Sequence, residues 1–222
     1  MPVTPISLGM VQAFLLRGER AVLVDAGMPG SAERILRAAA AHGVGPRDIS
    51  LILLTHSHQD HTGSAGELRE RTGAPLAIHS LDARALRQGT AAAGQPTSLL
   101  PRLLASLSRG MQSPALEPDI LLDGELDLSP YGVPGRAIPT PGHTPGSVSI
   151  LLPHGEAILG DLARGGMLFR RRPALPFFLD DREQWRQSLD LVLGWGRHTH
   201  WVSHGGPLTA EDLRRLQQAP PR

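Results

Sequence analysis

The sequence predicts an α/β fold made of two halves, in each of which short strands alternate with helices. Three observations favour this class. Short aliphatic runs at 21–24 and 51–54 are typical of buried strands, and each is followed by a helix start signal. Similar runs recur at 148–152 and 157–159, ahead of an amphipathic helix at 184–195. At 222 residues the chain can form one large domain or two small ones.

The first half is expected to open with a hairpin at an antiparallel edge, whose strands are 11–16 and 21–24. A helix with Ser31 as its N-cap then runs to about residue 41. Residues 46–50 form a loop into the strand 51–54. The elements expected next are a helix at 64–72, a strand at 74–79 and a helix at 81–86.

The segment 97–109 carries leucines at helical spacing and is predicted to be an amphipathic helix. It either packs onto the domain or forms a lid whose apolar face covers a site. The chain is therefore expected to be a single domain over 1–222 with a helical insertion or lid around 81–118.

The second half is expected to contain several short strands, a loop and two helices. The strands are 120–122, 125–128, 136–138, 148–152, 157–159 and 199–203; the loop is 162–181; the helices are 184–195 and a last one that Thr209 caps and that ends near residue 218.

Four side chains able to bind a metal follow the strand 51–54 directly. They are His56, His58, Asp60 and His61. Neutral imidazole and carboxylate are ligands that zinc, iron and manganese accept. In an extended loop His56 and His58 project the same way and can hold one ion, and the other two fall where a second ion could sit. A histidine-rich surface loop is the alternative, but it does not explain four such groups at the mouth of a buried strand.

Three more chemical elements follow the same logic. His143 lies between glycines and prolines in Thr140–Ser147, which fix its backbone. Asp161 and Asp25 each end an aliphatic strand. Asp25 is either a turn former or a carboxylate that orients a metal-bound histidine.

His204 follows the strand 199–203 and is the predicted ligand there, whereas His200 is expected to be a packed or exposed strand residue. His79 has no partner at a chelating spacing and is interpreted as a structural or surface residue.

Composition excludes several functions. The chain has no cysteine, which excludes disulfides, thiolate nucleophiles and iron–sulfur clusters, and all 22 of its Lys+Arg residues are arginine, which excludes Schiff-base chemistry. The net charge of +1 does not suggest a nucleic-acid partner. No signal-like or membrane-length apolar run is present, so a cytoplasmic protein without a membrane partner is expected.

These elements, in this order, resemble the metallo-β-lactamase superfamily over nearly the whole chain. The family's five motifs match Asp25, the segment 56–61, His143, Asp161 and His204. The resemblance implies a four-layer αββα sandwich with the metals at one edge of two facing sheets.

The resemblance also implies the ligands. His56, His58 and His143 would hold one metal, Asp60, His61 and His204 the second, and Asp161 would bridge both, with Asp25 behind them. Two divalent ions are expected, with zinc as the first choice and iron or manganese as alternatives. A metal-bound hydroxide would attack the substrate, and the metal or a protonated Asp60 would assist the leaving group.

One main class of true β-lactamases uses a cysteine ligand that this chain lacks, and its ligand set instead resembles that of the glyoxalase II and lactonase side of the family. Glyoxalase II carries a helical domain for glutathione; here the residues 205–222 follow the last ligand, and specificity for a glutathione thioester is not expected. Lactonases place a tyrosine soon after the bridging aspartate, where this chain has Leu162, Ala163 and Arg164, and its only tyrosine is Tyr131. Arg164 either recognises an anion or is an exposed loop residue.

The leading hypothesis is a dinuclear metal-dependent hydrolase of a small ester, thioester or lactone. The apolar helix 97–109 and the pair Phe177 and Phe178 suggest a hydrophobic small-molecule substrate. The alternative is an enzyme like the family's persulfide dioxygenases, with one iron held by His56, His143 and Asp161. The sequence leaves the oligomeric state open.

Overall fold

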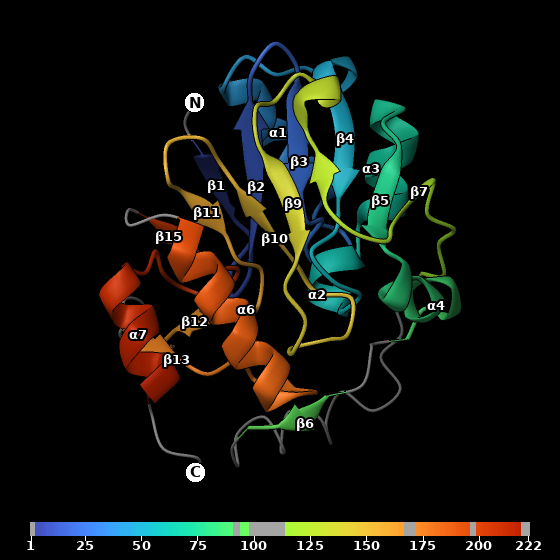
Figure 1. Cartoon of the computed structure of the whole chain (residues 1–222). Helices are drawn as coiled ribbons and strands as arrows, with labels where there is room; N and C mark the ends of the chain where they lie inside the picture. Colours follow the sequence, from blue (N-terminus) through green and yellow to red (C-terminus); the bar gives the residue numbers. More distant parts are fainter. Residues whose placement is uncertain (1–2, 91–93, 98–113, 167–171, 196–198, 219–222) are drawn as a thin grey trace.

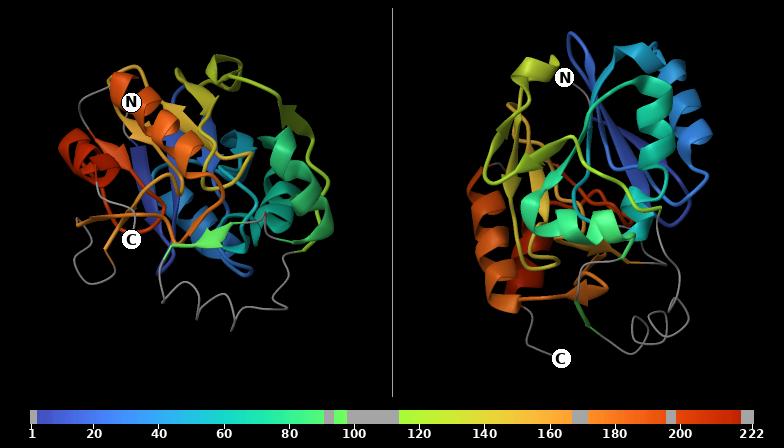
Figure 2. Two further views of the ribbon diagram at one scale, coloured as in Figure 1. Left: turned by 60° about the horizontal axis from the view of Figure 1, so that its bottom comes forward. Right: turned by 90° about the vertical axis from the view of Figure 1, so that its right-hand side faces the viewer.

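The computed structural model describes residues 3–90, 94–97, 114–166, 172–195 and 199–218, and it contains two main β-sheets packed face to face between helices (Figures 1 and 2). The first sheet has six strands in the order β1-β2-β3-β4-β5-β7. The second has five strands in the order β15-β11-β10-β9-β8.

The first sheet changes from antiparallel to parallel at β3, where the chain begins its strand–helix alternation. Its strands are β1 (Val3–Ser7), β2 (Gln12–Arg17), β3 (Ala21–Val24), β4 (Ile49–Leu53), β5 (Leu76–His79) and β7 (Ile120–Leu122). The pairs from β3 to β7 are all parallel, so the carboxyl ends of these strands meet at one edge of the sheet. Ligand sites gather at such edges.

The second sheet is antiparallel except for the pair β11 and β15. Its strands are β8 (Leu126–Asp127), β9 (Arg136–Pro139), β10 (Val148–Leu151), β11 (Ala157–Ile158) and β15 (His200–Trp201). Two small ribbons, β6 (Gln95–Pro96) with β14 (Phe178–Leu179) and β12 (Arg164–Gly165) with β13 (Pro173–Ala174), lie beside it in the loops.

Helices cover the outer face of each sheet, as the side view in Figure 2 shows. The helices beside the first sheet are α1 (Ala32–Ala41), α2 (Gln59–Thr62), α3 (Ala65–Thr72) and α4 (Ser80–Gln88), with the 3₁₀ turn η1 (Pro46–Asp48). Those beside the second are α6 (Arg182–Trp195) and α7 (Ala210–Gln218); a further 3₁₀ turn, η2 (Ser129–Tyr131), joins β8 to β9.

Three apolar clusters separate the four layers, and the alternation of side chains along each strand produces them. In β3, Leu23 belongs to the same cluster as Ile35 of α1, while its neighbours Val22 and Val24 belong to the cluster between the two sheets. On the far side of the second sheet, Leu159 packs under Trp185 of α6. The predicted αββα sandwich is therefore the observed fold.

Several local predictions need correction. The amino-terminal hairpin has a third strand, β1, whose polar and proline residues hide the strand pattern; it pairs antiparallel with β2 at the sheet edge. The second half of the loop 55–63 is a helical turn, α2, and not extended chain. The loop 46–50 contains η1 and the start of β4, the predicted strand 199–203 shortens to β15, and the loop 162–181 contains β12, β13 and β14.

Most of the predicted helix 97–109 lies outside the described residues, so the insertion or lid around 81–118 and the single-domain boundary stay predictions. Among the described residues, no helix is long and apolar enough to cross a membrane.

Candidate metal centre

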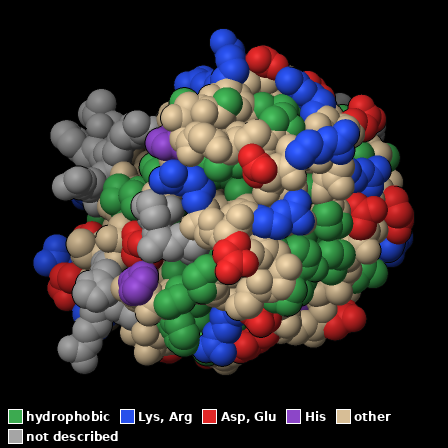
Figure 3. Space-filling view, turned by 90° about the horizontal axis from the view of Figure 1, so that it is seen from above, with side chains coloured by type: hydrophobic (Ala, Val, Ile, Leu, Met, Phe, Trp, Pro, Cys, Tyr) green, Lys and Arg blue, Asp and Glu red, His purple; other side chains and the backbone are tan. Residues whose placement is uncertain are grey.

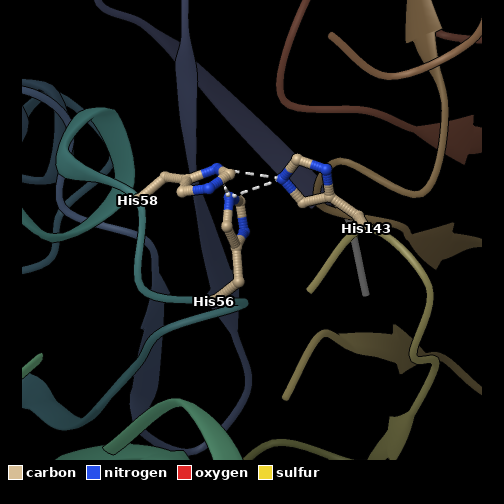
Figure 4. Close-up of side chains that lie close together, drawn as sticks. All are labelled: His56, His58 and His143. Carbon is tan, nitrogen blue, oxygen red and sulfur yellow. Dashed lines mark hydrogen bonds between the residues drawn. The ribbon is translucent and has the colours of Figure 1, made fainter. Parts of the chain in front are cut away.

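Three histidines from two distant loops form the first cluster of the site (Figure 4). His56 and His58 follow β4, and His143 lies on the loop between β9 and β10. The His143 Nε2 is 3.1 Å from the His56 Nε2 and 3.0 Å from the His58 Nδ1, and these last two atoms are 3.1 Å apart. Tetrahedral coordination at about 2.0–2.1 Å places nitrogen ligands at about 3.3 Å from one another, so this triangle fits one ion.

For His143 and His56, the hydrogen bond that Nδ1 makes determines that Nε2 is the nitrogen that faces the cluster. The His143 Nδ1 lies 2.7 Å from the Phe178 carbonyl oxygen, which can only accept, so Nδ1 carries the hydrogen. The Thr55 hydroxyl donates to Asp25 and therefore accepts from the His56 Nδ1, at 3.0 Å. Both Nε2 atoms are thus left with lone pairs directed at the cluster.

The loop that carries His143 is held tightly against α6. Gly142 has φ +130°, and a Cβ there would stand 2.5 Å from the Trp185 Cα and backbone N. Its carbonyl also accepts the N–H groups of Asp180 and Asp181 at 2.7 and 3.0 Å. Only glycine fits this close approach, and the packing fixes the position of the histidine that follows.

Asp60, His61 and His204 form the second cluster, with ligand atoms within 4.8 Å of one another. The His204 Nε2 is 3.2 Å from the Asp60 Oδ2, and the His61 Nε2 is 3.7 Å from the Asp60 Oδ1. The His204 Nδ1 donates a hydrogen bond to the Met10 carbonyl at 2.8 Å, so Nε2 is the ring nitrogen that is available to a metal ion. The turn α2 brings His61 next to Asp60 on the same side.

Asp161 lies between the two clusters. One carboxylate oxygen, Oδ2, is 3.3 Å from the His204 Nε2 and 3.8 Å from the His143 Nε2. The other, Oδ1, is 3.6 Å from the His61 Nε2, and neither of these two atoms makes a hydrogen bond with the described residues. Buried polar atoms are normally paired, so two such orphans facing each other indicate room for a cation.

Asp25 orients the second cluster from behind, as one of the two sequence interpretations proposed. It is fully buried at the end of β3 and has φ +63°, an uncommon conformation for a residue other than glycine. Its Oδ2 accepts from the His61 Nδ1 at 2.8 Å, and its Oδ1 accepts from the Thr55 N–H at 2.8 Å. The histidine tautomer and the β4 loop are therefore fixed by one carboxylate.

The two clusters differ in charge. Burial, followed by the neighbouring histidines, keeps the pKa of His56 well below its ordinary value, and burial with the His58 charge lowers the pKa of His143 to about 3. These imidazoles are neutral, as metal ligation requires.

In the second cluster, burial also disfavours charged imidazole, but the carboxylates outweigh it. Asp25, Asp60 and Asp161 raise the pKa of His61 to about 9. Asp161, then Asp60, raise the pKa of His204 well above its ordinary value. Burial disfavours the charged forms of Asp60 and Asp161, yet the histidines hold both pKa values below their usual range. A metal cation bound in this cluster would take the place of the ring protons on His61 and His204.

All seven predicted ligands therefore converge on one place, at the edge of the first sheet where β3 and β4 end. The atoms that could bind a metal are imidazole nitrogens and carboxylate oxygens, which are borderline and hard ligands. Three of the histidines donate the N–H of their other ring nitrogen to a carboxylate or a carbonyl. That second layer of hydrogen bonds is typical of histidines that ligate metals. The residues fit two divalent ions.

Sequence reasoning missed Asp82. This fully buried residue of α4 accepts from the Ser57 N–H at 2.9 Å, the Thr144 hydroxyl at 3.0 Å and the Gly146 N–H at 2.8 Å. It thus joins the loop of His56 and His58 to the loop of His143. An acidic residue in the first turn of a helix is usually explained by its favourable interaction with the helix dipole, and no signal in the sequence sets Asp82 apart from such residues.

The remaining histidine predictions hold. His79 is buried and structural, because its Nδ1 accepts from the Leu81 N–H at 3.3 Å and caps α4. His200 is 1% exposed and lies away from the clusters, and neither of its ring nitrogens has a hydrogen-bond partner among the described residues. Arg164 is half-buried, so the alternative of an exposed loop arginine is wrong.

A family model described as the metallo-beta-lactamase superfamily matches residues 6–203, which includes every residue of the first cluster and Asp161. The chain belongs to the metallo-β-lactamase superfamily. Members of this superfamily are metal-dependent, and the clusters described above are the chain's candidate metal groups.

Relatives point the same way. The probable metallo-hydrolase YqgX of Bacillus subtilis (strain 168) is 30% identical over 171 residues, which are 75% of this chain and 72% of that protein. A hydroxyacylglutathione hydrolase of Anaeromyxobacter dehalogenans (strain 2CP-C) is 35% identical over 148 residues, 67% of this chain but only 44% of the relative.

Among solved structures, the B3 metallo-beta-lactamase BLEG-1 superposes with a TM-score of 0.71. The match covers 98% of both chains at 22% identity. At this identity the likeness concerns the superfamily fold alone.

Proposed function

We propose that this chain is a dinuclear metal-dependent hydrolase of a small ester, thioester or lactone. One observation carries the proposal: seven donor side chains from separate loops converge as two clusters, and the Asp161 carboxylate lies between them. The assignment of His56, His58 and His143 to one ion and of Asp60, His61 and His204 to the other, with Asp161 shared, is part of the proposal.

Two divalent ions, when bound, would supply a water of lowered pKa as the nucleophile and would polarise the bond under attack. The chain's own residues do the rest. The side chain of Asp60 is 32% exposed, whereas those of Asp161 and His61 are 6% and 0% exposed. Asp60 is therefore the carboxylate that a substrate reaches, and it takes the proton of the attacking water and returns it to the leaving group.

Two aromatic rings line the clusters and favour a substrate with an apolar part. The Phe177 ring centroid is 5.7 Å from that of His204, and the Phe178 ring centroid is 6.0 Å from that of His58. Phe178 is the first residue of β14, which pairs with β6, and Phe177 comes directly before it. Such walls exclude water from one side of the reacting bond.

The test is turnover of a panel of small esters, thioesters and lactones by the metal-loaded protein. The variants His61→Ala and His204→Ala should each lower kcat by roughly 10²-fold or more, because each removes a ligand. His154→Ala removes an exposed histidine and serves as the matched control. Full activity in either ligand variant contradicts the two-metal mechanism.

The single-iron alternative rests on three of the same residues, His56, His143 and Asp161, all of which lie in the site. Metal content per chain, measured on protein purified without added metal or chelator, separates the two. About two zinc or manganese ions support the hydrolase. About one iron per chain, together with oxygen uptake in the presence of glutathione persulfide, would support the dioxygenase in place of the hydrolase.

The proposed partner is a small molecule and not a nucleic acid or a membrane. On the face seen in Figure 3, arginine and acidic side chains are interspersed, and the net charge of the chain is +1. Nucleic-acid binding normally needs a basic stripe or patch. The cytoplasmic location stays a prediction.

A further inference from the structure

The outer face of the second sheet carries a groove that lies away from the metal clusters. Two hollows of about 600 and 400 Å³ open there, and both are lined by Glu125, Arg136, Leu151 and Trp195, so they form one continuous groove. Volumes of this size are typical of sites for small molecules. The groove lies at the end of the β9–β10 hairpin opposite to the loop of His143, and no described helix lies over β9 in Figure 1.

The floor of the groove follows from the register of three strands. Asp127 of β8 pairs with Arg136 of β9, and Arg136 pairs with Leu151 of β10. Residues directly opposite each other on neighbouring strands share a face of the sheet. Leu151 belongs to the same apolar cluster as Trp185 of α6, so the whole row faces outward.

The last turns of α6 form the wall of the groove. Asp190, Leu191, Gly194 and Trp195 line it, and their spacing places them on one side of the helix. Leu191 and Trp195 remain 53% and 39% exposed, so apolar surface is open to a ligand here. The Trp195 Nε1 donates to the Leu152 carbonyl at 3.2 Å, which holds the ring in place.

The arginine on the floor already has partners. The Arg136 Nη1 is 3.0 Å from the Glu125 Oε2, and its Cζ lies 4.6 Å from the Trp195 ring centroid, within the range of a cation–π contact. The charges of Arg136 and Glu125 therefore cancel, and this pair adds no net charge to the groove.

Two aspartates remain without a cation. Asp127 accepts from the Ser129 N–H at 2.9 Å and Asp190 accepts from the Gln217 Nε2 at 2.7 Å, and neither forms an ion pair within the described part of the chain. The bond from the Ser129 backbone holds the pKa of Asp127 below its usual range, so this carboxylate is ionised at neutral pH.

The two carboxylates stand apart, with apolar surface between them. Asp127 lines only the larger hollow and Asp190 only the smaller one, whereas Leu151 and Trp195 line both. A second copy of this face would bring the aspartates of both copies together, and like charges disfavour such a contact. A linear molecule with a cationic group at each end and methylene groups between them matches both carboxylates and the apolar middle.

We propose that the groove binds a linear aliphatic diamine or polyamine, with one ammonium group at Asp127, another at Asp190, and the methylene chain along Leu151 and Trp195. The groove is separate from the metal clusters, so the proposal does not depend on the hydrolase function.

Calorimetry with octane-1,8-diamine and octylamine tests the proposal, because the two ligands have the same chain and differ by one ammonium group. Wild type should bind the diamine about two- to fivefold more tightly, the range expected for one more exposed ion pair, and the difference should shrink as salt is added. Equal affinities of the two ligands for wild type overturn the proposal.

Variants then assign the ammonium sites. Asp127→Asn and Asp190→Asn keep an acceptor oxygen for Ser129 and Gln217, so the fold is retained, and each should lose the preference for the diamine. Glu67→Gln removes an exposed carboxylate of α3, beside the first sheet, and is the control that should keep the preference. A preference that survives in both aspartate variants contradicts the proposed site.

NMR signals of the indole N–H groups locate the ligand. The diamine should shift the signal of Trp195 and leave that of Trp185, which is fully buried and packs on the His143 loop at Gly142. A shift of the Trp185 signal alone places the diamine near the metal centre and overturns the proposal. A dimer that Leu191→Asp converts to a monomer, with no diamine bound, assigns the groove to a second copy of the chain instead.

Discussion

Replacing Asp82 by asparagine tests whether a residue outside the metal clusters determines their geometry. In the folded protein both carboxylate oxygens of Asp82 act as acceptors: Oδ1 for the Gly146 N–H, and Oδ2 for the Ser57 N–H and the Thr144 hydroxyl. Asparagine has the same shape but only one acceptor oxygen. At least one buried backbone N–H must then face an NH₂ group.

The size of the effect follows from these contacts. A buried donor left unpaired costs about 1–3 kcal/mol, and the Thr144 hydroxyl can turn to the Ser147 hydroxyl 2.8 Å away, which limits the loss. We therefore expect Asp82→Asn to lower the free energy of unfolding by about 1–3 kcal/mol. Because Ser57 lies between two proposed ligands and Thr144 follows a third, zinc affinity should also fall, by about 10- to 100-fold.

Two assays on one variant separate a structural role from a positioning role. Urea unfolding of the metal-free protein gives the free energy of unfolding, and competition with a chromophoric chelator gives the zinc affinity of the folded protein. Asp123→Asn, on the exposed turn after β7, makes the same chemical change and should shift stability by less than about 0.5 kcal/mol. Unchanged zinc affinity in folded Asp82→Asn would refute the positioning argument, even if stability falls.

Three other predictions concern the same scaffold. Gly146→Ala should mimic the loss of Asp82, because a Cβ there would stand 2.6 Å from the Asp82 Oδ1; wild-type zinc affinity and melting temperature in this variant would contradict the close packing. Burial lowers the pKa of His200 below its ordinary value. The stability that its neutral form contributes is therefore present above about pH 6.5 and is lost as the pH falls from there toward the folded-state pKa. His200→Phe should flatten this part of the pH–stability curve, and an unchanged slope would show that His200 does not take up a proton on unfolding. Thr209 and Asp212 bond each other's backbone N–H at 3.1 and 2.9 Å at the start of α7, so Thr209→Ala should cost about 1 kcal/mol in urea unfolding, and no loss would mean that the cap is dispensable.

The candidate metal-binding residues could be predicted because the signals for them are local in the sequence. His56, His58, Asp60 and His61 fall within six positions directly after an aliphatic strand, and His143 stands between glycines and prolines. Strand and helix order was predictable for the same reason, since hydrophobic periodicity is a local property. Several short strands were not predicted from it, and β1 and β12 show why. The edge strand β1 has only one side of its backbone in a sheet, and β12 has two residues, so neither leaves a clear hydrophobic pattern.

Asp82 and Arg164 mark the limit of local reasoning. The sequence shows an aspartate near a helix start and an arginine in a loop, and both patterns are common on protein surfaces. Asp82 joins two loops only because α4 packs where residues 57 and 144–146 meet, which are 25 and 62–64 positions away from it along the chain. The guanidinium of Arg164 lies over the ring of Phe177, the residue just before β14, which is a contact between distant parts of the sequence.

By itself, then, the sequence predicted most of the elements and the candidate donor set, and its resemblance to a known family implied the arrangement of two sheets. The tertiary structure alone decided which nitrogen of His61 and His143 faces the clusters and that the Asp161 carboxylate stands between them. The physical reason is that hydrogen bonds and burial join residues distant along the chain, whereas propensity and periodicity act over a few neighbouring residues.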